Sequence, residues 1–166
     1  MLNDDYGQRI HLTQKMKSGA NWFYWIAGLS MITSILAVSG SGWRFFLSLG
    51  ITQFIDGFAA ALSNEVGTAG LVIGIVLNIF ITAVFAGLGF LARKKHLWAF
   101  VVGMVLFALD ALLLLLFLDI FAILFHGLAI YYIFRGFQAA RDLVALEQAA
   151  AMQPPAPPQT AQAQSI

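Results

Sequence analysis

Long runs without charge are the feature that most constrains how this chain can fold. Residues 97–134 contain no Lys, Arg or Glu, and their only acidic side chains are Asp110 and Asp119, while residues 66–92 carry no charge at all. The whole chain is 60% hydrophobic and 10% charged, whereas about a quarter of the residues in soluble domains are charged. A water-soluble core cannot absorb this much apolar surface, so the sequence predicts an all-α protein embedded in a lipid bilayer.

Charge and cysteine content exclude several classes of function. The formal net charge is +1 and the chain has no cysteine, so it offers no broad basic field for nucleic acid and no thiolate for disulfide, redox or nucleophilic chemistry. No histidines or carboxylates share one predicted helix at the spacing of metal ligands. We therefore expect the bilayer as the main partner, with no nucleic acid, no metal, no cofactor and no catalytic set.

Four apolar segments are long enough to cross the membrane. About 20 helical residues, at 1.5 Å each, match a hydrocarbon core of roughly 30 Å. The last two segments are separated only by Leu118-Asp119-Ile120, where we expect a tight turn. The predicted fold is a polytopic four-helix bundle with spans at about residues 20–38, 66–92, 97–118 and 120–137.

Polar segments flank this predicted membrane domain of residues 19–138. Residues 1–18 form a cytoplasmic N-terminal segment, and residues 139–166 comprise a short helix followed by a Pro-, Gln- and Ala-rich tail that we expect to be disordered. The first apolar run also admits a cleaved signal peptide as an alternative, because Lys15 and Lys17 precede it and small residues follow at its end. Its length exceeds the usual 7–15 apolar residues of such a signal, which favours a span.

Residues 43–62, WRFFLSLGITQFIDGFAAAL, decide the topology, because they are long enough to cross yet carry Arg44, Gln53 and Asp56. Cytoplasmic loops are enriched in Lys and Arg. If this segment crosses and the basic N-terminus lies inside, the most basic loop, Arg93-Lys94-Lys95-His96, lies outside. If it does not cross, that loop and the basic end of the last span both lie inside. We therefore expect four spans with both termini in the cytoplasm.

The polar residues of this segment share one side of a helix. Steps of four residues advance about 400°, and such steps join Arg44, Ser48, Thr52 and Asp56, with Gln53 beside them. A polar sector opposite an apolar face is typical of an amphipathic helix lying in the membrane interface. We expect such a helix between the first two spans. A re-entrant or fully spanning helix is the alternative, because polar residues can also face the interior of a bundle.

Counting residues from the outer ends of the spans predicts a polar pocket inside the membrane. Asp110 lies eight residues before the end of its span and His126 seven residues after Asp119, which places them about 12 and 10 Å deep. Because their helices are consecutive and antiparallel, we expect the two to touch, with Asn78 nearby at about 17 Å and Asp56 above them. Such a pair serves either a ligand or proton or helix register, and the sequence leaves both open.

Small residues mark the faces where helices approach closely. The second span carries a stripe at four-residue spacing that includes a GxxxG pair, and the first span has a comparable face. We expect packing within one bundle rather than dimerisation, because GxxxG pairs are common in spans. The stripe consists of Gly70, Gly74, Asn78, Thr82 and Ala86, and the face on the first span consists of Ala27, Ser30, Ser34 and Ala37.

Two stretches carry a likeness to known proteins. They are ALDALLLLLFLDIFAILFHGLAIYYIFRG, residues 108–136, and GITQFIDGFA, residues 50–59. The order Leu-Asp, apolar run, Asp, Phe-His and terminal Arg-Gly resembles a set of small bacterial four-span integral membrane proteins of unassigned function. The resemblance covers most of the membrane part. It implies this fold and the plasma (inner) membrane of a bacterium, and it carries no activity.

The function expected from these patterns is non-enzymatic. Without a nucleophile–base set, a nucleotide loop or metal ligands, the chain is best interpreted as an accessory or scaffold subunit of a larger membrane complex. The alternative is a small transporter or ligand-binding protein that uses the Asp110–His126 pocket. An enzyme acting on lipid or quinone ranks last, because a mechanism would need a third group that the sequence does not supply.

Overall fold

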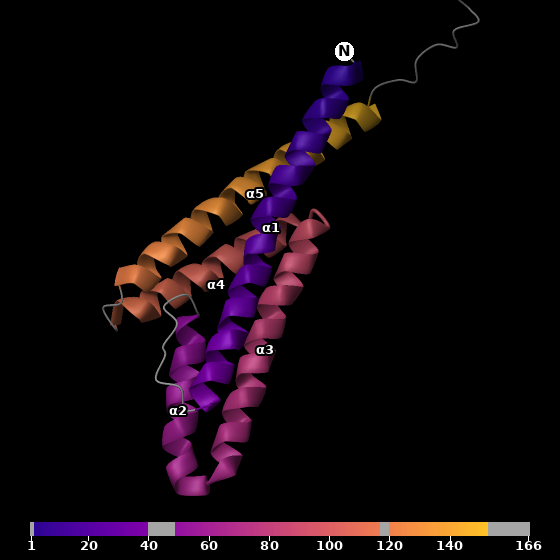
Figure 1. Cartoon of the computed structure of the whole chain (residues 1–166). Coiled ribbons are helices and arrows are strands. Elements are labelled where there is room, and N and C mark those ends of the chain that lie inside the picture. Colours follow the sequence, from indigo (N-terminus) through magenta and orange to yellow (C-terminus); the bar gives the residue numbers. More distant parts are fainter. Residues whose placement is uncertain (1, 40–48, 117–119, 153–166) are drawn as a thin grey trace, which may run out of the picture.

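The computed structural model describes residues 2–39, 49–116 and 120–152. In these residues the chain forms five α-helices and no strand (Figure 1). The expected all-α class is therefore confirmed. The helices are α1 (Leu2–Val38), α2 (Gly50–Val66), α3 (Thr68–Arg93), α4 (Leu97–Leu116) and α5 (Ile120–Met152).

Three of the helices in the described part of the chain, α3, α4 and α5, are long and apolar enough to cross a membrane. Their outward faces are apolar as well: on α3, Val72, Val76 and Phe80 are more than half exposed. A surface of this kind is stable when lipid is the solvent. The structure thus supports a helical membrane protein.

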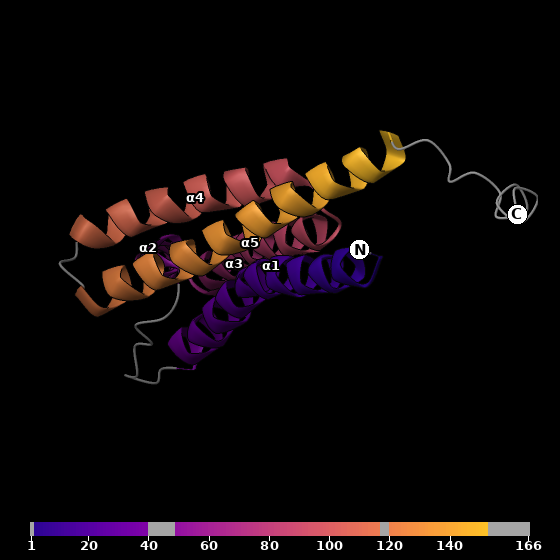
Figure 2. The ribbon, with the colours of Figure 1, turned by 90° about the horizontal axis from the view of Figure 1, so that it is seen from above.

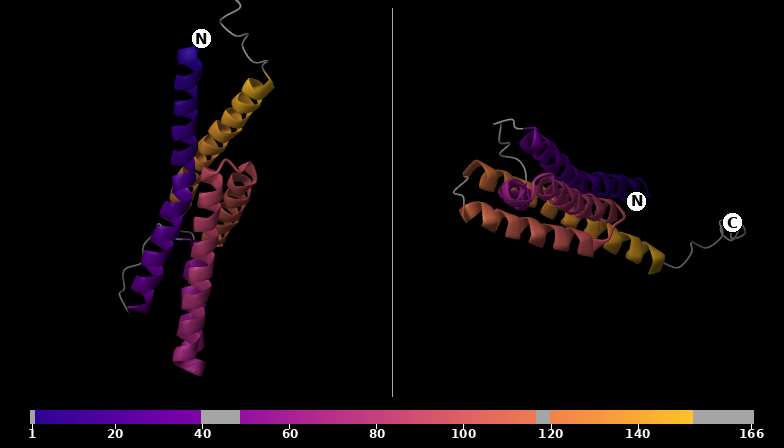
Figure 3. Two further views of the ribbon diagram at one scale, coloured as in Figure 1. Left: turned by 90° about the vertical axis from the view of Figure 1, so that its right-hand side faces the viewer. Right: turned by 90° about the horizontal axis from the view of Figure 1, so that it is seen from below.

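The helices are arranged as two crossing layers. α1 runs antiparallel to α3, while α4 and α5 form an antiparallel pair that lies across them (Figure 2). α2 packs beside the N-terminal half of α3, and its own N-terminus reaches the α4–α5 layer (Figure 3). The start of α1 and the end of α5 lie at the same end of the molecule (Figure 1).

Glycines set the closest helix contacts. A Cβ atom at Gly19 of α1 would lie 2.5 Å from the Cα atom of Gly136 on α5, so the two backbones touch at this crossing. A Cβ atom at Gly70 would lie 2.7 Å from the backbone of Ser63, so the glycine stripe of α3 packs against α2. Gly70 and Gly74 therefore serve packing within one chain, as the sequence predicts.

The two outer helices are longer than the sequence predicts. α1 is helical from Leu2, and α5 continues without a break to Met152, so the residues after 138 are helical as expected but belong to the same helix as the last predicted span. The reason is mutual packing: Met16 of α1 and Leu143 of α5 are both buried in the same apolar cluster. Each helix covers an apolar stripe of the other beyond the predicted spans.

α2 begins later and ends later than expected, at Gly50 and Val66 instead of residues 43 and 62. Its polar stripe faces the protein, since Thr52 is buried and Asp56 partly buried, whereas Phe54 and Phe58 are more than half exposed. The first part of the predicted helix, with Arg44 and Ser48, lies outside the described residues. So do the predicted turn at residues 118–119 and the Pro-rich tail.

The turn between α2 and α3 is a single residue, Gly67, with φ 66° and ψ −145°. L-residues with a side chain rarely adopt this conformation, which glycine reaches at little cost. The Gly67 amide also donates to the carbonyl of Ser63 at 2.9 Å, closing the last turn of α2. This reversal makes α2 and α3 a helical hairpin.

Candidate functional site

Asp110 caps a helix to which it does not belong. Its carboxylate lies on α4 and is 4% exposed, and it accepts hydrogen bonds from the amides of Gly50 at 2.7 Å and Ile51 at 2.8 Å. These are the first two N–H groups of α2, which have no partner within the helix. The preceding residue, Leu49, has no side chain that can cap them. An anion at this position is also favoured by the helix dipole.

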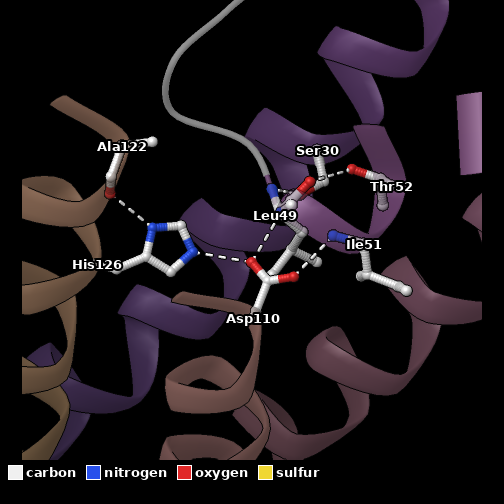
Figure 4. A network of polar contacts seen from close by, with 8 residues as sticks. Ser30, Leu49, Ile51, Thr52, Asp110, Ala122 and His126 are labelled. Carbon is white, nitrogen blue, oxygen red and sulfur yellow. Dashed lines mark hydrogen bonds and ion pairs between the residues drawn. The ribbon is translucent and has the colours of Figure 1, made fainter. Parts of the chain in front are cut away.

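His126 of α5 completes the contact (Figure 4). Its Nε2 atom lies 2.9 Å from Asp110 Oδ2, and its Nδ1 atom lies 2.7 Å from the carbonyl oxygen of Ala122, one turn earlier. A carbonyl oxygen only accepts, so Nδ1 carries a hydrogen. The contact between Nε2 and Oδ2 then needs a proton of its own, held either as an imidazolium–carboxylate pair or as a carboxylic acid donating to a neutral ring. The pair therefore holds one proton between its two members.

Aromatic packing shields this pair. The ring of Phe107, one turn before Asp110 on α4, stacks on the imidazole of His126 with centroids 4.0 Å apart and an angle of 14° between planes. Phe107 is fully buried and His126 is 1% exposed. Phe125 meets the imidazole edge-on at 6.2 Å. The pair is thus enclosed within the protein, where its electrostatic interactions are strong.

The first helix holds the same segment from the other side. The amide of Leu49 donates to Ser30 Oγ of α1 at 3.1 Å, and Thr52 Oγ1 donates to the carbonyl of Leu49 at 2.8 Å. The N-terminus of α2 is therefore bound to α1 through Ser30 and to α4 through Asp110. Through His126 the connection extends to α5. Four helices meet at this one network.

A second polar cluster lies between α1, α2 and α3. Asp56 accepts a hydrogen bond from Ser34 Oγ at 3.3 Å and another from the side-chain amide of Asn78. The Asp56 carboxyl is partly buried, and these two hydrogen bonds join it to α1 and α3. Asn78 itself is 2% exposed, and its Oδ1 atom accepts no hydrogen bond from the described residues.

The structure thus divides the four predicted pocket residues between two places. Asp110 and His126 meet, as their depths predict. Asn78 instead pairs with Asp56, so the expectation that these two would join Asp110 and His126 is wrong. The depth of Asn78 in the membrane does not indicate which face of α3 carries it. The glycine stripe indicates that face, because Asn78 continues the line of Gly70 and Gly74 that packs against α2.

Sequence reasoning also missed partners of both clusters. In the sequence, Ser30 and Ser34 stand out only as small packing residues. The two amides at the start of α2 belong to Gly50 and Ile51, whose side chains give no polar signal. Ser30 and Ser34 were detectable, because they are polar residues one turn apart on a face expected to be buried. Among the residues that the structure describes, no three His, Asp or Glu side chains lie close enough to hold a metal ion.

Asp110 and His126 form hydrogen bonds only with groups of the protein that the structure describes. Both carboxylate oxygens and both ring nitrogens have partners inside the protein. A catalytic acid or base must reach its substrate within hydrogen-bond distance, and here the groups are engaged with backbone and with each other.

No protein-family model, curated protein or solved structure matches this chain.

Proposed function

We propose that this chain is a non-enzymatic multi-pass protein of a bacterial plasma membrane, and that it acts as an accessory or scaffold subunit of a larger membrane complex. The observation that carries the proposal is that both carboxylate oxygens of Asp110 already have partners inside the protein. They accept hydrogen bonds from the start of α2, and one of them also contacts His126. The polar residues inside the membrane domain therefore hold helices together, as interhelical polar contacts do.

The topology that we propose has four spans, with α2 entering the membrane as a re-entrant helix. Two features support re-entry over a helix on the surface: the polar stripe of α2 faces the protein, and α2 lies antiparallel beside α3. A helix that starts within hydrocarbon must have its free N–H groups satisfied by protein. Asp110 meets this need for Gly50 and Ile51. The basic turn after α3 then lies in the cytoplasm, together with both termini.

The alternative of a transporter built on Asp110 and His126 has less support. In transporters, the N-terminus of a broken helix faces an anionic substrate near the middle of the membrane. In this chain the carboxylate of Asp110 occupies that position at the N-terminus of α2. A substrate anion would have to displace an internal one that is also bound to His126.

The ends of α1 and α5 supply surface for a partner. Both helices continue beyond the predicted spans, where Tyr6, Ile10 and Met152 are exposed. Tyr6 and Ile10 are one turn apart on α1 and so share a face. Apolar side chains at these positions are outside the lipid in the proposed topology and favour contact with another protein.

Purification of the full chain in native lipid, followed by mass spectrometry of co-eluting proteins, tests the proposed role. We expect a stoichiometric membrane-protein partner that is lost in the double variant Tyr6→Ala/Ile10→Ala and kept in the lipid-facing control Leu124→Ala. A monodisperse monomer without a partner in native lipid would contradict the scaffold role.

Topology has a separate test, made simple because the chain contains no cysteine. Single cysteines at Ser63, near the end of α2, and at Lys94, after α3, should react with membrane-impermeant reagents from the outer and the cytoplasmic side, respectively. The reverse pattern, with Ser63 labelled from the cytoplasm and Lys94 from outside, is what a fully spanning α2 requires and would overturn the four-span arrangement. Labelling of both from the same side would overturn it as well.

A further inference from the structure

A cavity of about 280 Å³ lies between α1 and α3, apart from the Asp110 network. Its wall is aliphatic except for two polar residues, and three of its isoleucines are also exposed on the outer surface of the bundle. The cavity is therefore reached from the lipid side. Its lining residues are Met31, Ser34 and Ile35 of α1 and Ile75, Asn78 and Ile79 of α3.

The polar atom of this cavity that lacks a partner is an acceptor. One N–H of the Asn78 side-chain amide donates to Asp56, which fixes the orientation of the amide and leaves its Oδ1 atom without a partner among the described residues. The hydroxyl hydrogen of Ser34 is also committed to Asp56. A buried carbonyl oxygen without a donor is destabilising, and a ligand that supplies one regains that loss.

We propose that this cavity binds a single-chain apolar molecule with a hydroxyl group, whose O–H donates to Asn78 Oδ1 while its chain lies along Met31, Ile35 and Ile75. Ester and phosphodiester groups of ordinary phospholipids only accept hydrogen bonds and leave this oxygen unpaired. A free alcohol supplies the missing donor. The inference rests on Asn78 and the cavity, and it is independent of the proposed scaffold role.

Photolabelling of the full chain in phosphatidylcholine nanodiscs tests this site, because that headgroup carries no hydrogen-bond donor. The probe is a ten-carbon alcohol with a diazirine in its chain, and the competitors are 1-decanol and decyl methyl ether, which differ in the presence of the donor. We expect labels on the cavity residues of α1 and α3. Decanol should compete about ten-fold better than the ether, the factor expected for one hydrogen bond.

Three variants locate the effect. Asn78→Leu should abolish the preference for decanol, because it removes the acceptor. The matched control is Thr82→Val, one turn along α3 and outside the lining residues, which removes another buried oxygen that has no partner among the residues described. Ile75→Phe fills the cavity without touching a hydrogen bond and should block labelling by the probe. It keeps the test decisive if Asn78→Leu fails to fold.

Either of two results would overturn the inference. One is a label spread evenly over the lipid-facing surface of the helices, which would indicate ordinary lipid contact. The other is equal competition by decanol and its methyl ether in the wild-type protein, which would show that no donor is selected.

Discussion

Replacing Asp110 should loosen the whole membrane domain, because its carboxylate joins α2, α4 and α5. In Asp110→Ala, the amides of Gly50 and Ile51 lose their acceptor and His126 loses its partner. Each buried polar group left unpaired costs about 1–3 kcal/mol, and three groups lose their partner, the two amides and the imidazole. Because the structure can relax around them, these costs add only in part, and we expect a loss of about 3–5 kcal/mol of unfolding free energy.

A graded pair of substitutions sharpens this expectation. Asp110→Asn keeps one carbonyl oxygen for an α2 amide and offers N–H groups to His126, so it should cost about 1–3 kcal/mol. The matched control is Leu109→Ala, the preceding residue on α4, which is 54% exposed. Lipid replaces the contacts that this control loses, so its effect should stay below about 1 kcal/mol.

Two measurements check the prediction. Equilibrium unfolding in detergent micelles gives the change in free energy for each variant. Hydrogen exchange of the Gly50 and Ile51 amides reports the cap itself, and both amides should lose protection in Asp110→Ala but not in Leu109→Ala. The reasoning fails if Asp110→Ala is no less stable than the control, or if the two amides stay protected.

Two further predictions follow from contacts elsewhere. Gly136→Ala should cost about 1–3 kcal/mol in thermal unfolding, because its Cβ atom would lie 2.7 Å from Gly19 Cα. Gly127→Ala on the same helix, with nothing within 4 Å of its Cβ position, should cost nothing. If the two variants behave alike, the close crossing of α1 and α5 is not limiting. Asp56→Leu should cost about 1–3 kcal/mol of unfolding free energy, because Ser34 Oγ and the side-chain amide of Asn78 lose their common acceptor. An unchanged unfolding free energy would contradict this account.

The Asp110–His126 contact was predictable because it depends only on local geometry. Two consecutive antiparallel helices share one turn, so counting residues from that turn fixes the relative height of their side chains. The contact that Asn78 makes depends on a third helix, and equal depth on separate helices says nothing about which faces meet. For Asn78, the glycine stripe of α3 predicts the face that is buried, because small residues along one face allow another helix to pack closely against it.

The orientation of α2 was harder to predict from sequence. A repeat of polar residues every four positions shows that they share a face, but the same pattern suits a face turned to water or a face turned to protein. The buried Thr52 and exposed Phe54 select the second. The cap on α2 is invisible in the sequence, since its donors are backbone amides. The length of α5 is hard to predict for a related reason: the buried residues of its extension are only Ala139, Ala140 and Leu143, an apolar stripe too short to stand out in the sequence.

The position of Asp110 also decides where the molecule has polar groups left for a ligand. A helix that begins inside an apolar domain presents free N–H groups and a positive dipole end, which together form an anion site. Asp110 of α4 already occupies that site and also contacts His126. An external anion would have to replace the hydrogen bonds that the Asp110 carboxylate makes, so its net binding free energy would be small. The Oδ1 atom of Asn78, by contrast, has no hydrogen-bond donor within the part of the chain that the structure describes. Polar recognition by this protein is therefore expected on the α1–α3 side of the bundle, and it should select donors rather than anions.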